Sequence, residues 1–218
     1  MAAQSPGPDP ESALRGWRHR LASLHRRATY TRWFGRYVLA AAVVFFASGF
    51  AGYAVVDAIP LEALRALVPD ESVLPEFSAT AIARNNLRVL ALLAGGLVTL
   101  GLVATLVLTV NGLVVGAVVA LAVREFSWPV ILAALLPHGV LELPAFWLAA
   151  AATFRFAVRV GRWALGYDDR PVTRVEAYEL AVLFAGLALV IVVAAWIEVH
   201  VTPVVIRRVA GPGSGALS

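Results

Sequence analysis

Residues 87–123 read LRVLALLAGGLVTLGLVATLVLTVNGLVVGAVVALAV, and apart from Arg88 they carry no charged side chain. A membrane span takes about 20 residues, so this run is too long for one span and long enough for two. Asn111-Gly112 is its strongest turn dipeptide. We therefore expect a helical hairpin, with the second span of the chain before Asn111 and the third after it.

The composition of the whole chain agrees with a membrane location. Of its 218 residues, 60% are hydrophobic and 15% are charged, whereas a soluble domain is about half apolar and a quarter charged. Cysteine is absent, which excludes disulfides and thiolate metal sites. The sequence contains no Walker loop, G-x-S-x-G elbow or G-x-G-x-x-G turn. We expect an all-α membrane protein without a cofactor.

Three further apolar runs have the length of a span: Tyr37–Val56, Val140–Val158 and Ala177–Val199. Val130–Leu136 is too short to cross and is closed by Pro137-His138-Gly139, which favours a re-entrant half-helix. The predicted fold is a bundle of about five transmembrane helices, with this half-helix and an N-terminal amphipathic helix at the membrane interface.

The sequence divides into four parts. Residues 1–10 are rich in Pro, Ser and Gly and predict a disordered tail. Residues 11–36 predict a cytoplasmic amphipathic helix, because apolar residues recur every three or four positions among arginines; a solvated helix packed on a partner is the alternative. Residues 37–203 form the transmembrane helical domain, and residues 204–218 form a polar C-terminal tail.

The distribution of charge predicts the orientation in the cell membrane. Arginines are concentrated before the first span and between Arg155 and Arg174, whereas residues 57–83 are acidic. Because basic segments stay on the cytoplasmic side, we expect the N-terminus inside and the acidic loop outside. Arg207 and Arg208 disagree with the external C-terminus that five crossings imply.

Ionisable residues inside spans are costly and often functional. His138 and Glu142 stand one helical turn apart, and Glu198 is the other carboxylate within a span. We expect a polar intramembrane site of His138 and Glu142, with Asn111 and Glu198 as possible neighbours. Metal ligation by His138, Glu142 and Glu198 is a weaker hypothesis, because neither HExxH nor a dense ligand cluster is present. A structural His–Glu pair, and a Glu198 that reaches the interface, are the alternatives.

Other polar and small residues have less specific interpretations. The outer end of the predicted second span carries Arg84, Asn85 and Asn86. These residues are expected either to form a polar vestibule or to anchor the helix at the membrane interface. If the role of Asn111 is structural, its side chain is expected to hydrogen-bond to backbone groups that the turn leaves without partners. Small residues that favour packing or turns are Gly112, Gly116, Gly139 and Pro137.

The order of four elements resembles the stage II sporulation protein M family over roughly residues 83–203. The elements are Arg84-Asn85-Asn86-Leu87; Val110-Asn111-Gly112 with Gly116; Leu136-Pro137-His138-Gly139 with Glu142-Leu143; and Ile197-Glu198 with Thr202-Pro203. The resemblance implies a membrane protein of five or six helices. In endospore-forming bacteria it implies work during engulfment with partners that remodel septal peptidoglycan, and it brings no established catalytic residues.

Two functions follow as hypotheses. The first is a non-catalytic membrane scaffold or transport-related subunit in envelope or membrane remodelling, with the lipid bilayer and other membrane or envelope proteins as partners, self-association as an alternative, and no nucleic acid. The second is an intramembrane metal-dependent hydrolase that uses the His/Glu site.

Overall fold

The computed structural model describes residues 30–60 and 78–210, which are helical with short connections and contain no strand. The helices are α2 (Tyr30–Asp57), α4 (Ala79–Gly95), α5 (Leu102–Glu125), α6 (Trp128–Ala164), α7 (Arg174–His200) and α8 (Thr202–Ala210). The expected N-terminal tail, the apolar stripe of the interfacial helix and most of the acidic loop lie outside the described residues.

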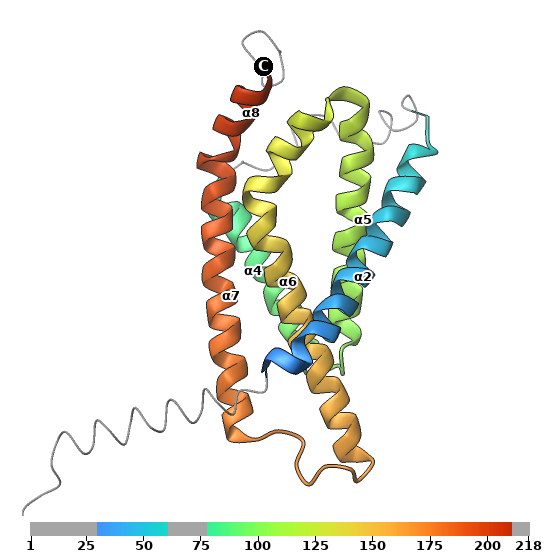
Figure 1. Ribbon diagram of the computed structural model, residues 1–218, viewed down its shortest axis with the longest axis vertical. Helices are drawn as coiled ribbons and strands as arrows, with labels where there is room; N and C mark the ends of the chain where they lie inside the picture. Colours follow the sequence, from blue (N-terminus) through green and yellow to red (C-terminus); the bar gives the residue numbers. More distant parts are fainter. Residues whose placement is uncertain (1–29, 61–77, 211–218) are drawn as a thin grey trace, which may run out of the picture.

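The long helices run alternately in opposite directions along the bundle (Figure 1). The turn from α4 to α5 and the loop from α6 to α7 lie at one end, and the turn from α5 to α6 and the end of α7 lie at the other. Four segments are long and apolar enough to cross a membrane, in α2, α5, α6 and the stretch of α7 and α8, and α4 is shorter at 17 residues. The prediction of an all-α membrane bundle is confirmed.

The predicted turn at Asn111-Gly112 is wrong. Helix α5 passes through both residues without interruption, and the turn lies at residues 96–101, where Leu100 and Gly101 have φ values of 51° and 88°. Asn111 does not break the helix because its amide Nδ2 donates to the carbonyl of Val107 at 2.8 Å. A polar side chain in hydrocarbon satisfies itself on its own helix in this way.

The expected half-helix at Val130–Leu136 is instead the first part of α6, a continuous helix of 37 residues with Pro137 and Pro144 inside it. A proline removes one intrahelical hydrogen bond and bends a helix, but membrane helices tolerate this where neighbouring helices surround the bend. Figure 1 shows α6 bending along its length. At 1.5 Å per residue it is about 55 Å long, more than a hydrocarbon core of about 30 Å, so its arginine-bearing end extends beyond the core.

The predicted polar tail at 204–218 begins as a helix in the structure, because α8 extends to Ala210. Before it, α7 starts with a capping box. The Thr173 hydroxyl accepts from the Glu176 backbone N–H at 3.2 Å, and the Glu176 carboxylate accepts from the Thr173 backbone N–H at 2.9 Å. Two backbone donors that α7 leaves free at its N-terminus are thereby satisfied.

Glycines bring α2 and α5 into backbone contact. A Cβ added to Gly116 of α5 would overlap the carbonyl of Gly49 in α2, and one added to Gly52 of α2 would overlap the backbone of Leu113 in α5. Gly112 likewise leaves room for the backbone of Phe45. Lipid tails are as apolar as leucine, so helices in a membrane gain stability from such close packing rather than from expelling water.

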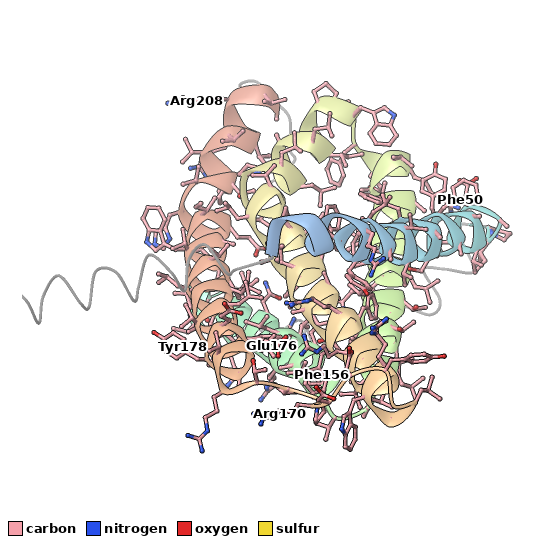
Figure 2. All side chains as sticks on the ribbon, turned by 60° about the horizontal axis from the view of Figure 1, so that its bottom comes forward. Phe50, Phe156, Arg170, Glu176, Tyr178 and Arg208 are labelled. Atoms are coloured by element: carbon pink, nitrogen blue, oxygen red, sulfur yellow. The ribbon has the colours of Figure 1, made fainter. Side chains whose placement is uncertain are left out.

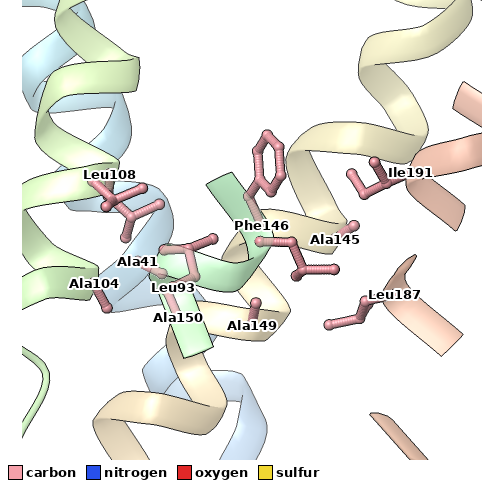
Figure 3. Packing of buried hydrophobic residues seen from close by; sticks show 12 residues of the cluster. Ala41, Leu93, Ala104, Leu108, Ala145, Phe146, Ala149, Ala150, Leu187 and Ile191 are labelled. Carbon is pink, nitrogen blue, oxygen red and sulfur yellow. The ribbon is translucent and has the colours of Figure 1, made fainter. Parts of the chain in front are cut away.

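Small residues also fill the centre of the bundle. Ala145, Ala149 and Ala150 of α6 are buried, and beside them lie Leu93 of α4 and Ile191 of α7 (Figure 3). A row of alanines lets α6 approach several helices at once, which makes it the central element of the fold.

An arginine closes the end of α2. The Arg124 guanidinium, at the end of α5, donates to the carbonyls of Val56, Asp57 and Ile59 at 2.8, 3.0 and 3.1 Å. The last carbonyls of a helix have no partner within it and carry its negative dipole end. Arg124 thereby ties the ends of α2 and α5 together.

We predict that Gly116→Ala destabilises the protein by about 1–3 kcal/mol, because the new methyl group meets backbone that cannot move aside. The control is Gly186→Ala on α7, where a Cβ meets nothing within 4 Å and the better helix propensity of alanine adds stability of about 0.5–1 kcal/mol. Denaturation in detergent measures both. Equal midpoints for the two variants would contradict the close contact of α2 with α5.

Candidate functional site

Three ionisable side chains converge in the bundle. His138 and Glu142 of α6 and Glu198 of α7 each offer a ligand atom, and these atoms all lie within 4.8 Å of one another. All three residues are partly buried. We call this group the His-Glu-Glu cluster.

Helix geometry explains why the cluster forms. His138 and Glu142 are four residues apart on a continuous helix, so they share one face. Because α6 and α7 run in opposite directions, the first part of α6 lies beside the last part of α7 (Figure 1). Glu198 is two residues from the end of α7 and therefore meets that face.

The cluster brings two carboxyl groups close together inside the bundle. If both were ionised, carboxylates within 4.8 Å of each other would repel by about 3 kcal/mol at an effective dielectric constant of about 20. The Nδ1 atom of His138 is buried and has no hydrogen-bond partner among residues 30–60 and 78–210. A histidine and two carboxyl groups at this spacing are a donor set that could hold a cation.

The other predicted site residues are placed as follows. The Asn111 amide is used within α5. On α4, Arg84 and Asn85 are exposed whereas Asn86 is buried and accepts from Asn85 Nδ2 at 3.4 Å. A Cβ on Gly139 of α6 would meet nothing within 4 Å, so this glycine does not mark a close contact in the described structure.

Sequence reasoning missed an ion-pair group at the opposite end of the bundle. Glu176 of α7 accepts from Arg159 Nη1 at 2.6 Å and lies 3.7 Å from Arg155 Nη2. In the adjoining loop, the hydrogen bond from Arg162 lowers the pKa of the Asp168 carboxyl. The T-x-x-E pattern at Thr173 was a signal for the position of Glu176. Figure 2 shows Glu176 and Arg170 at one end of the molecule and Arg208 at the other.

Thr153 was also missed, since nothing in its sequence context distinguishes it. It is fully buried on α6, and its hydroxyl donates to the carbonyl of Leu93 in α4 at 3.0 Å. It therefore links α6 to the end of α4, on a carbonyl that also accepts from the backbone N–H of Gly96 at 3.1 Å.

A cavity of about 700 Å³ that is open at the bundle surface lies between α2, α5 and α6 and is lined by apolar side chains, among them Phe46, Phe50 and Trp147. None of the three residues of the cluster lines it. The cavity and the cluster are therefore separate features of the bundle.

Comparison with known proteins gives the family. A family model described as Stage II sporulation protein M matches residues 41–203, which include the whole cluster. The chain belongs to the stage II sporulation protein M family. An uncharacterised protein of Methanocaldococcus jannaschii is 32% identical over 129 residues, which are 59% of this chain and 72% of that protein. No solved structure matches the chain.

For this family member we predict that Glu142→Gln raises stability by about 1–3 kcal/mol in chelator at alkaline pH, because it removes the repulsion between the carboxylates. Glu179→Gln on α7 is the control for a glutamate outside the cluster and is expected to change stability by less than about 0.5 kcal/mol. Thermal unfolding in detergent measures both. A lower midpoint for Glu142→Gln would instead identify Glu142 as half of a structural pair.

Proposed function

We propose that the chain is a non-catalytic, transport-related subunit of a complex in the cell membrane that serves envelope or membrane remodelling. Its His-Glu-Glu cluster binds a small cation within the bilayer. The convergence of His138, Glu142 and Glu198 from two helices carries the proposal.

Ionisable side chains inside a span cost free energy, and this cost supports an ion-binding role for the cluster over that of a passive scaffold. A scaffold needs surfaces and loops, and an apolar interface between α6 and α7 would hold those helices together at lower cost. Ionisable residues in a span are kept where they bind or conduct ions. A cation lowers the cost of the two carboxylates, so the arrangement is suited to binding and release.

The arrangement of cavities favours ion handling over hydrolysis. A hydrolase needs space for its substrate next to the catalytic groups. The 700 Å³ cavity is apolar and is not lined by the cluster. Within the described residues, the cluster is the one group of three or more His, Asp or Glu that fits a metal ion.

Subunit status is tested by purifying the tagged chain from the membranes of its own host in nanodiscs and identifying the proteins that accompany it. We expect membrane or envelope proteins in fixed ratio, and each of them, when tagged, should recover this chain. Recovery of the chain alone would overturn the subunit role. Substrate turnover that is lost in Glu142→Gln would overturn the non-catalytic role.

The arrangement of arginines supports an orientation with the N-terminus in the cytoplasm. Arg155, Arg159, Arg162, Arg170 and Arg174 gather where α6 leads into α7, at the same end of the bundle as the start of α2 (Figure 1). Basic segments are retained on the cytoplasmic side.

We predict that a cysteine at Asp169, in the loop between α6 and α7, is protected from an impermeant thiol reagent in intact cells. A cysteine at Ser127, in the turn between α5 and α6, should be modified. Both positions are exposed, and the natural chain has no cysteine, so labelling reports only the introduced thiol. Labelling of position 169 with protection of position 127 would reverse the orientation.

A further inference from the structure

We infer that the cation bound by the His-Glu-Glu cluster is a divalent first-row transition metal ion of the zinc type, an inference that rests on the proposed function. The donor set decides the class of ion. Sodium, potassium, magnesium and calcium prefer sites built from oxygen atoms. His138 adds an imidazole nitrogen to the carboxylates of Glu142 and Glu198, and nitrogen with carboxylate oxygen suits zinc and its neighbours.

The spacing fits such an ion after small side-chain movements. Ligand atoms about 2.0–2.1 Å from a tetrahedral ion lie about 3.4 Å apart. In the structure the candidate atoms lie within 4.8 Å of one another. Bringing the atoms to that spacing requires rotation of the three partly buried side chains.

Charge points to a divalent ion. Two carboxylates and a neutral imidazole hold one M²⁺ with no net charge left in the apolar bundle. The arginines nearest in sequence to the cluster on α6, Arg155 and Arg159, lie more than three helical turns away beside Glu176. The buried, unpaired Nδ1 of His138 is a nitrogen whose lone pair or proton has no use within the described protein.

The ligand count suits an ion that enters and leaves. Structural zinc sites use four protein ligands, whereas three protein ligands leave a position for water or an incoming group. Because two ligands come from α6 and one from α7, the ion also joins these helices. Binding therefore depends on how α6 and α7 are packed, and their packing depends on binding.

The test begins with purified full-length protein in detergent, stripped with a chelator and dialysed against zinc chloride. We expect about one zinc per chain, and Glu198→Gln and His138→Ala should each weaken binding roughly tenfold or more. Two controls lie outside the cluster: Glu179→Gln, and His200→Ala, whose ring Nδ1 instead lies 2.9 Å from the carbonyl of Trp196. Zinc affinity that is unchanged in both cluster variants would overturn the inference.

A gain-of-signal variant covers the case in which the loss variants fold poorly. His138→Cys keeps a metal ligand at this position and introduces the only thiol of the chain. With cobalt(II) in place of zinc, it should show a thiolate-to-cobalt charge-transfer band, which Glu198→Gln in the same background should weaken. A folded His138→Cys protein without that band would overturn the inference.

The outcomes separate this inference from the proposed function. Stabilisation by sodium or calcium that is lost in Glu142→Gln, without zinc binding, would overturn the transition metal and leave a cation-binding subunit. Failure of every cation to bind would overturn both. Zinc binding at the cluster in a chain that purifies without partners would leave the metal site and overturn the subunit role.

Discussion

Hydrocarbon offers no water to backbone N–H and C=O groups, so every such group within the bilayer needs a partner in the protein. Helices meet this need along their length but not at their ends. In this chain two of the ends are bound by side chains from other helices: Arg124 donates to three carbonyls at the end of α2, and Thr153 donates to Leu93 near the end of α4. These contacts fix the connections between helices as well as satisfying the backbone.

Hydrocarbon also removes the usual reason for helices to associate, which is the exclusion of water from apolar surfaces. Because lipid is as apolar as the bundle interior, packing density replaces water exclusion as the source of stability. The glycines between α2 and α5, such as Gly116 against Gly49, and the alanines of α6, such as Ala149 and Ala150, are therefore the residues on which the fold depends. Large apolar residues such as Phe50 and Leu102 are instead exposed at the surface, as expected where lipid surrounds the protein.

The sequence predicted the helices well because the thickness of the bilayer sets the length of an apolar run that spans it. It placed the α4–α5 turn wrongly because turn dipeptides follow the preferences of soluble proteins, and in α5 the Asn111 amide is satisfied by Val107 one turn earlier. That His138 and Glu142 lie on one face of a helix was readable from a spacing of four. That Glu198 approaches His138 and Glu142 could only be a hypothesis from the sequence. It depends on how far α7 extends beside the bent α6, and no local sequence pattern encodes the register of these two helices.

The prolines inside α6 flank the segment that carries His138 and Glu142. Pro137 directly precedes His138, and Pro144 follows Glu142 by two residues. Each proline lacks an N–H, so the carbonyls one turn before it, of Ala133 and Val140, lose their partners within α6. The two proposed metal ligands of α6 thus lie on the segment between and beside these prolines, opposite the end of α7. A cation that drew Glu198 toward His138 and Glu142 would select one geometry of the bend in α6, so the proposed occupancy and the helix arrangement would be thermodynamically linked. A rigid scaffold has no use for such a link, whereas a subunit that responds to an ion requires it.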